Sequence, residues 1–95
     1  MTNRKQPFGY KICRGKPVIY ETEADIVRQI FKAYLSGASY STITDMLRGQ
    51  AISYDEGKPW NKNMIARILG DRRYIGNDVY PQIISATDFS IVQRQ

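Results

Sequence analysis

The chain has 95 residues, of which 42% are hydrophobic and 12% aromatic, and this composition favours one folded domain over a disordered segment. One cysteine and no histidine exclude an internal disulfide and a zinc site built from the usual ligands, and we expect no metal and no cofactor. No run of about 18 apolar residues is present, so we expect no membrane span. The polar and basic N-terminus does not resemble a signal peptide, and we expect a cytoplasmic protein. Cys13 is expected to be a small buried side chain.

The formal net charge of +5 is unevenly distributed along the chain. Residues 1–20 contain five basic and no acidic residues, and residues 58–73 contain five basic residues and one acidic residue. Between these two segments, residues 21–57 contain three basic and six acidic residues. Such segregation favours a polyanionic partner, whose phosphates would give affinity and salt dependence without sequence preference.

The N-terminal segment, residues 1–6, is polar and basic because it carries Arg4 and Lys5, and we expect a flexible arm or a linker before a single domain at residues 7–95. Residues 7–13 alternate large apolar and other side chains, as a half-buried strand does. A turn at residues 14–16, in which Gly15 can adopt positive φ, leads to a returning apolar segment. Together these features predict a small β-hairpin.

Two amphipathic helices are predicted next. In the first, Thr22 is the expected N-cap, Gly37 is the expected stop, and apolar side chains recur at helical spacing at Ala24, Val27, Ile30, Phe31, Tyr34 and Leu35. In the second, Ser39 is the expected cap, Gly49 is the expected stop, and the inward side chains are Tyr40, Ile43, Met46 and Leu47. We expect both stripes to lie in the core.

The third predicted helix, residues 61–69, is the segment best suited to bind a partner. Asn61 is its expected N-cap, Trp60 stands where a hydrophobic staple would, and Gly70 is expected to end it in a left-handed conformation. Its inward stripe consists of Met64, Ile65, Ile68 and Leu69. The opposite face is small, polar and basic, with Lys62, Asn63, Ala66 and Arg67. Such a face suits a DNA major groove, and the alternative is an ordinary solvated helix face.

The second and third helices form a helix-turn-helix-like pair, although a compact motif has a turn of only about three or four residues and this connection is much longer. Residues 72–80 are predicted to be extended with a turn at Gly76-Asn77, and the extended chain continues to residue 84. Ser85 or Thr87 then caps a last helix with apolar side chains at Phe89, Ile91 and Val92. The predicted fold class is α+β and helix-rich, with a small N-terminal β-hairpin, a helix-turn-helix-like core, a short extended segment and a C-terminal helix.

Catalysis by this chain is not expected. Its serines have no histidine to serve as a base, and those near glycine or at helix starts are explained as caps. Most of its tyrosines fall on apolar stripes or beside strands, as core residues do. The sequence therefore offers no nucleophile–base pair.

Several sequence segments, in order along nearly the whole chain, resemble the "recombinase" domain of large serine recombinases. They include Pro7-Phe8-Gly9-Tyr10, Trp60-Asn61, Arg67-Ile68-Leu69, Tyr74-Ile75-Gly76 and Pro81-Gln82-Ile83-Ile84. The resemblance implies a domain that binds attachment-site DNA, with residues 61–69 as its recognition segment. It also implies that the nucleophilic serine belongs to a separate N-terminal catalytic domain and that this chain begins after it. The zinc-bearing domain and coiled coil that usually follow would lie outside this chain as well.

Double-stranded DNA is therefore the expected partner. The predicted base contacts are Lys62, Asn63, Ala66 and Arg67. The predicted phosphate contacts are Arg4, Lys5, Lys58, Arg72 and Arg73. The alternatives are a protein-interaction module with an acidic partner and a free-standing accessory regulator of recombination. We expect the domain alone to be monomeric and the parent recombinase to act as a dimer or tetramer on DNA.

Overall fold

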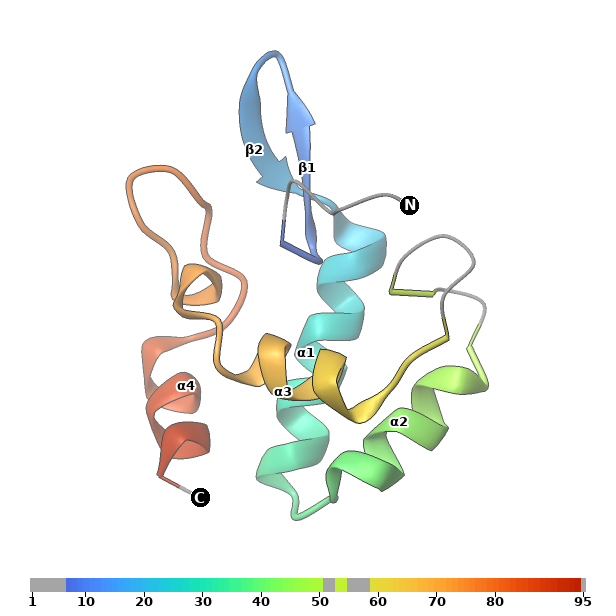
Figure 1. Cartoon of the computed structure of the whole chain (residues 1–95). Coiled ribbons are helices and arrows are strands. Elements are labelled where there is room, and N and C mark those ends of the chain that lie inside the picture. The colour runs from blue at the N-terminus through green and yellow to red at the C-terminus, as the bar shows by residue number, and fades with distance from the viewer. Residues whose placement is uncertain (1–6, 51–52, 55–58, 95) are drawn as a thin grey trace.

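A computed structural model describes residues 7–50, 53–54 and 59–94 of the chain (Figure 1). Its elements follow in the order β1 (Tyr10–Cys13), β2 (Lys16–Ile19), α1 (Glu21–Leu35), α2 (Tyr40–Arg48), α3 (Lys62–Leu69), the 3-10 helix η1 (Arg72–Ile75) and α4 (Ala86–Gln93). Figure 1 shows α1 in the middle, with α4 on one side, α2 on the other and α3 in front. The predicted helix-rich α+β fold with an N-terminal hairpin is confirmed.

The hairpin is antiparallel and closes through a turn of two residues. Tyr10 pairs with Ile19 at its root, and Cys13 pairs with Lys16 at its free end. Arg14 and Gly15 have φ values of +53° and +79°, which is the requirement of a type I′ turn. The positive φ predicted for Gly15 is therefore confirmed, but Cys13 is exposed rather than buried, because it lies at the end that projects away from the helices (Figure 1).

Helix α1 buries the centre of its predicted stripe completely, since Ala24, Val27 and Ile30 are 0% exposed. The N-cap prediction was wrong: the helix begins at Glu21, and its N-cap residue, Tyr20, makes no side-chain cap hydrogen bond. The chain passes from the hairpin, where the Tyr20 N–H donates to the Gly9 carbonyl at 2.9 Å, directly into the helix, so Thr22 already has helical backbone.

The end of α1 is as predicted. Gly37 has a φ of +102°, and its N–H donates to the Tyr34 carbonyl at 3.0 Å. The Ala38 N–H donates to the Ala33 carbonyl at 3.0 Å, which completes a Schellman motif. This turn sends the chain back along α1 into α2.

Helix α2 is capped by Ser39, whose hydroxyl accepts from the Thr42 N–H at 3.1 Å, as predicted. Its buried side chains are Ile43, Thr44 and Leu47. The prediction that Tyr40 and Met46 point inward was wrong, because they are 36% and 38% exposed. Thr44 takes a buried place instead, since its hydroxyl donates to the Tyr40 carbonyl at 2.7 Å and so loses no hydrogen bond on burial.

The chain after α3 departs most from the prediction. Gly70 ends α3 with a φ of −100°, so it is not left-handed. Residues 72–75 are not extended but form η1, because Asp71 caps that turn by accepting from the Arg73 N–H at 3.0 Å. The turn lies beyond Gly76, where the Asn77 side chain accepts from the backbone N–H groups of Val79 and Tyr80 at 2.7 and 2.8 Å.

Helix α4 is capped by Ser85, one of the two predicted caps, whose hydroxyl accepts from the Asp88 N–H at 3.1 Å. Phe89 and Val92 are buried against the core as expected, whereas Ile91 is 37% exposed and faces away from it. Among the helices that the structure describes, none is long and apolar enough to span a membrane.

Candidate nucleic-acid interface

Helix α3 has one buried face and one free face. Asn61 begins it as predicted, with its side-chain oxygen accepting from the Met64 N–H at 3.0 Å. Ile65, Ile68 and Leu69 are between 0% and 3% exposed and fix the helix on the core. The four residues predicted to contact bases are consequently all exposed and share the outer face: Lys62, Asn63, Ala66 and Arg67.

The start of α3 is held by an aromatic cluster. Trp60 is 1% exposed, and its ring meets those of Phe8 and Tyr54 edge-on, with centroids 5.1 and 5.5 Å away. The Arg48 guanidinium of α2 donates to the Trp60 carbonyl at 2.9 Å. The orientation of α3 is therefore set from both the N-terminal segment and α2.

A shallow groove of about 500 Å³ separates the start of α3 from α2, and the sequence did not predict it. Its lining is polar and consists of Ser41, Thr44, Asp45, Arg48, Asn61, Lys62 and Asn63. Arg48 thus lies beside two of the predicted base contacts. The only hint in the sequence was that a basic residue, Arg48, ends the first helix of the helix-turn-helix-like pair.

The two arginines of η1, which were predicted together as phosphate contacts, differ in their surroundings. The Arg73 guanidinium binds Asp71 through two nitrogens, at 2.9 and 2.7 Å, and lies 5.6 Å from the centre of the Tyr80 ring. The hydrogen bond that the Arg73 guanidinium donates to Asp71 raises the pKa of Arg73, and the carboxylate offsets its charge. Within the described residues, Arg72 has neither a salt bridge nor a side-chain hydrogen bond and is exposed, so it is the freer of the two cations.

Three predicted phosphate contacts, Arg4, Lys5 and Lys58, lie outside the residues that the structure describes. The same holds for most of the predicted loop before Trp60. Where side chains are described, no group of three or more cysteine, aspartate or glutamate residues is arranged to hold a metal ion.

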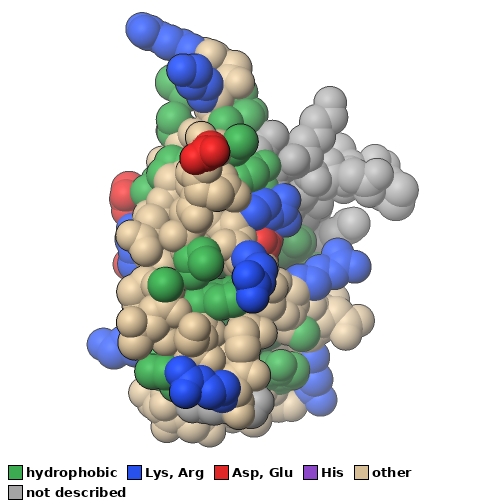
Figure 2. Space-filling view, turned by 90° about the vertical axis from the view of Figure 1, so that its left-hand side faces the viewer, with side chains coloured by type: hydrophobic (Ala, Val, Ile, Leu, Met, Phe, Trp, Pro, Cys, Tyr) green, Lys and Arg blue, Asp and Glu red, His purple; other side chains and the backbone are tan. Residues whose placement is uncertain are grey.

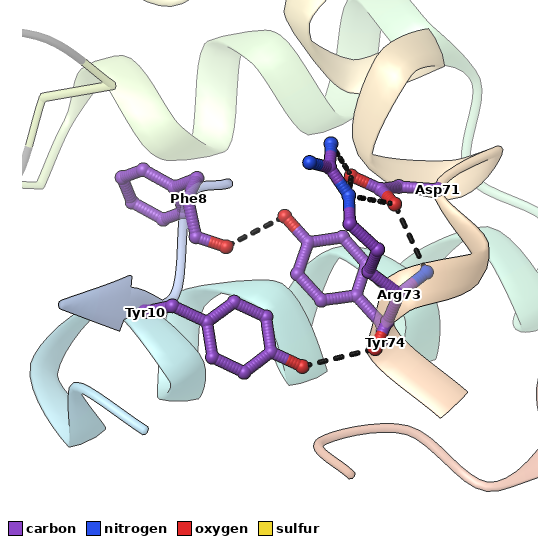
Figure 3. A network of polar contacts seen from close by, with 5 residues as sticks. All are labelled: Phe8, Tyr10, Asp71, Arg73 and Tyr74. Atoms are coloured by element: carbon purple, nitrogen blue, oxygen red, sulfur yellow. Dashed lines mark hydrogen bonds and ion pairs between the residues drawn. The ribbon is translucent and has the colours of Figure 1, made fainter. Parts of the chain in front are cut away.

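A pair of tyrosines joins the hairpin root to η1 (Figure 3). The Tyr74 hydroxyl donates to the Phe8 carbonyl at 2.6 Å, and the Tyr10 hydroxyl donates to the carbonyls of Pro81 and Arg73 at 2.5 and 3.1 Å. The two rings stack with centroids 5.9 Å apart. This network fixes η1, and with it Arg72, relative to the hairpin.

Replacing Tyr74 with phenylalanine is expected to lower the free energy of unfolding by about 1–3 kcal/mol, because it removes the buried hydrogen bond that the Tyr74 hydroxyl donates to the Phe8 carbonyl. Urea unfolding followed by circular dichroism measures this loss. The matched control is Tyr20→Phe at a position that is 36% exposed, where we expect a change within about 0.5 kcal/mol. Equal losses of stability in the two variants would show that the hydrogen bond of the Tyr74 hydroxyl contributes little to the free energy of unfolding.

The same network predicts that the folded state is less stable at alkaline pH. Burial, with a further contribution from Asp71, raises the pKa of Tyr10 to about 12, and burial raises the pKa of Tyr74 well above its ordinary value. Above pH ~10 the unfolded chain therefore loses protons that the folded chain retains, so the free energy of unfolding falls as pH rises to about 12, by about 1.4 kcal/mol per pH unit for each such tyrosine.

Urea unfolding at a series of pH values tests this dependence, and the slope in Tyr10→Phe should be shallower than in the unmodified chain. If the pH dependence of the free energy of unfolding were the same in Tyr10→Phe as in the unmodified chain, the raised pKa of Tyr10 would not be its cause.

Comparisons with known proteins identify a family and a shared fold for this chain. A family model described as Recombinase matches residues 21–95. Two solved structures, "Crystal Structure of a LSR-DNA Complex" and "Sequence Requirements of the Listeria innocua prophage attP site", each have a TM-score of 0.76 and 24% identity to this chain, and each match covers 99% of it. The chain corresponds to 32% and 43% of the lengths of those two chains. No curated protein sequence matches significantly.

Proposed function

The chain belongs to the Recombinase family, and on this premise we propose that it binds double-stranded DNA as the attachment-site recognition domain of a large serine site-specific recombinase. The observation that carries the proposal is the outer face of α3, which is exposed, carries two cations and an amide, and contains no acidic side chain. A helix with such a face fits the width of a major groove. The two similar folds come from proteins described with an LSR–DNA complex and with an attP site, which supports DNA as the partner.

In this proposal the outer face of α3 reads base edges. Arg67 can pair with guanine, and Asn63 can pair with adenine. Lys62 approaches from the first turn, and Ala66 leaves space for a thymine methyl group between the polar residues. These roles follow from the chemistry of the side chains on one exposed face.

The phosphate contacts set the register of the domain on the duplex. Arg72 has no ion pair among the described residues and can contact a phosphate directly. Arg73 would contact a phosphate while still paired with Asp71. Lys58, the third proposed contact, lies in the segment before Trp60. We propose residues 1–6 as a basic arm, with Arg4 and Lys5, that leads into the domain at residues 7–95. Cleavage and strand exchange would be supplied by a catalytic domain elsewhere in a complete recombinase.

A titration of the 95-residue chain with a random-sequence duplex at several salt concentrations tests the proposal. We expect log K to fall linearly with log salt concentration, by about 0.9 for each phosphate contacted. Selection from a randomised duplex pool should then enrich a preferred sequence, because base contacts specify and phosphate contacts do not.

The competing function is a protein-interaction module whose basic surfaces bind an acidic partner. Its supporting observation is the same segregated charge, which alone does not distinguish nucleic acid from an acidic protein. Failure of the chain to bind any duplex at low salt would overturn the DNA proposal and favour this alternative.

A further inference from the structure

The hairpin beyond its root, residues 11–16, is called the hairpin tip here, and it carries three cations that the proposed function does not use. Residues 11–16 are all exposed, and they include Lys11, Arg14 and Lys16 but no acidic residue. Figure 2 shows Lys and Arg side chains gathered at this projecting end. Among the described residues, neither Arg14 nor Lys16 has a salt bridge or a side-chain hydrogen bond, and Lys11 lies 5.0 Å from the centre of the Tyr20 ring.

The strand register places the two lysines on one face of the hairpin. Lys11 pairs with Val18 and Cys13 pairs with Lys16, and directly opposed residues lie on the same side of an antiparallel pair. Lys11 and Cys13 also share that side because side chains alternate along a strand. The lysines are therefore about 7 Å apart along the hairpin, at a rise of about 3.4 Å per residue. They face away from the buried Tyr10, with Arg14 at the tip.

The hairpin is attached firmly to the part of the molecule that carries the proposed interface. At its root, the Gly9 N–H donates to the Glu23 carboxylate at 2.9 Å, and the Tyr10 hydroxyl bonds to the carbonyls of Arg73 and Pro81. Tyr10 therefore connects β1 to η1, which follows α3 after two residues. The hairpin that carries these cations is therefore anchored at its root to the element that follows α3.

We propose that the hairpin tip is a second DNA-binding element, in which Lys11, Arg14 and Lys16 contact backbone phosphates of the duplex that α3 reads, on the side of its binding site facing the hairpin. This inference rests on the proposed function and adds a contact surface to it. A polyanion fits the tip better than a protein does, because protein interfaces have an apolar centre and Ile12 is the only large hydrophobic side chain strongly exposed in residues 11–16. The contact is independent of sequence, since phosphates carry no base information.

Two variants of the full chain remove the charges with little disturbance of the hairpin. Arg14→Asn keeps a side chain that tolerates the positive φ of a type I′ turn, and Lys11→Gln/Lys16→Gln keeps the length of the side chains. The matched control, Lys32→Gln/Arg94→Gln, removes the same charge as the lysine pair from exposed positions on α1 and after α4. Circular dichroism melts confirm that each variant is folded.

On a random-sequence duplex, we expect Arg14→Asn to reduce the salt slope by about 0.9, the lysine pair to reduce it by up to about 1.8, and the control to change it much less. On a duplex selected from a randomised pool, the sequence preference should be unchanged. Compared with the unmodified chain, the hairpin variants should no longer protect one backbone segment beside the α3 site from hydroxyl radicals. The segment at the α3 site itself should stay protected.

If the unmodified chain binds duplex DNA but its slope and footprint are unchanged in these variants, the hairpin contact is overturned and the proposed function stands. If slopes fall equally in the control, the effect is one of net charge and the contact is again overturned. If the unmodified chain binds no duplex, both proposals fail.

Discussion

Replacing Trp60 with alanine is expected to lower the free energy of unfolding by about 3–5 kcal/mol. The side chain is 1% exposed and is among the largest fully buried ones in the described part of the chain. Its ring contacts Phe8, which precedes the hairpin, and Tyr54, which precedes α3, so its removal leaves a cavity where three separate segments meet. A domain of this size typically has a total stability of about 5–15 kcal/mol, so the loss is a large share of it.

Urea unfolding measures the effect, with Trp60→Phe as the control because it keeps an aromatic ring in the same place. We expect that variant to lose clearly less stability than the alanine variant. Red-shifted and freely quenched tryptophan emission from the unmodified chain would contradict the prediction, because it would place the ring in water.

Local sequence signals predicted those parts of the fold that depend on neighbouring residues. Ser39, Asn61 and Ser85 cap α2, α3 and α4, since a cap needs only a short polar side chain and the three residues that follow. Gly37 ends α1 for the same local reason.

The errors arise where distant segments decide the local structure. Thr22 is not a cap, because the hairpin hydrogen bond between Tyr20 and Gly9 leads the chain into α1 two residues earlier than predicted. Besides the local Asp71 cap, η1 is held by a distant contact, in which the Tyr74 carbonyl accepts from the N–H groups of Ile83 and Ile84 at 2.8 and 2.9 Å. No pattern within residues 70–80 indicates a pairing with residues that lie almost ten positions away.

The candidate interface likewise has one part that the sequence predicts and one part that depends on distant segments. The outer face of α3 was readable from its helical period, because burying Ile65 and Ile68 leaves Asn63 and Arg67 outside. The difference in ion pairing between Arg72 and Arg73 could not be predicted from the sequence, since it depends on which guanidinium reaches Asp71. The groove beside Arg48 likewise requires the packing of α2 on α3, which lie thirteen residues apart in the sequence.

Alanine at Asn63 or Arg67 is expected to remove about 1–3 kcal/mol of discrimination between a preferred duplex and its altered versions, which is about 5- to 150-fold in relative affinity. The two residues are four positions apart, so they project from adjacent turns on one side of α3 and can reach neighbouring base pairs. Both are exposed, and alanine favours helix, so the substitutions should leave the fold intact. The measurement is a set of competition titrations with a duplex selected from a randomised pool and with its single-base variants.

Arg72→Ala is the matched control, because it removes one exposed cation that lies outside α3. It should weaken binding to all duplexes alike and reduce the salt slope by about 0.9, with the base preference retained. Equal weakening of preferred and altered duplexes by Asn63→Ala and Arg67→Ala would make these residues phosphate contacts too. The recognition role would then pass to the groove between α2 and α3, whose lining includes Arg48 and Lys62, and the same titrations on Arg48→Ala would test it.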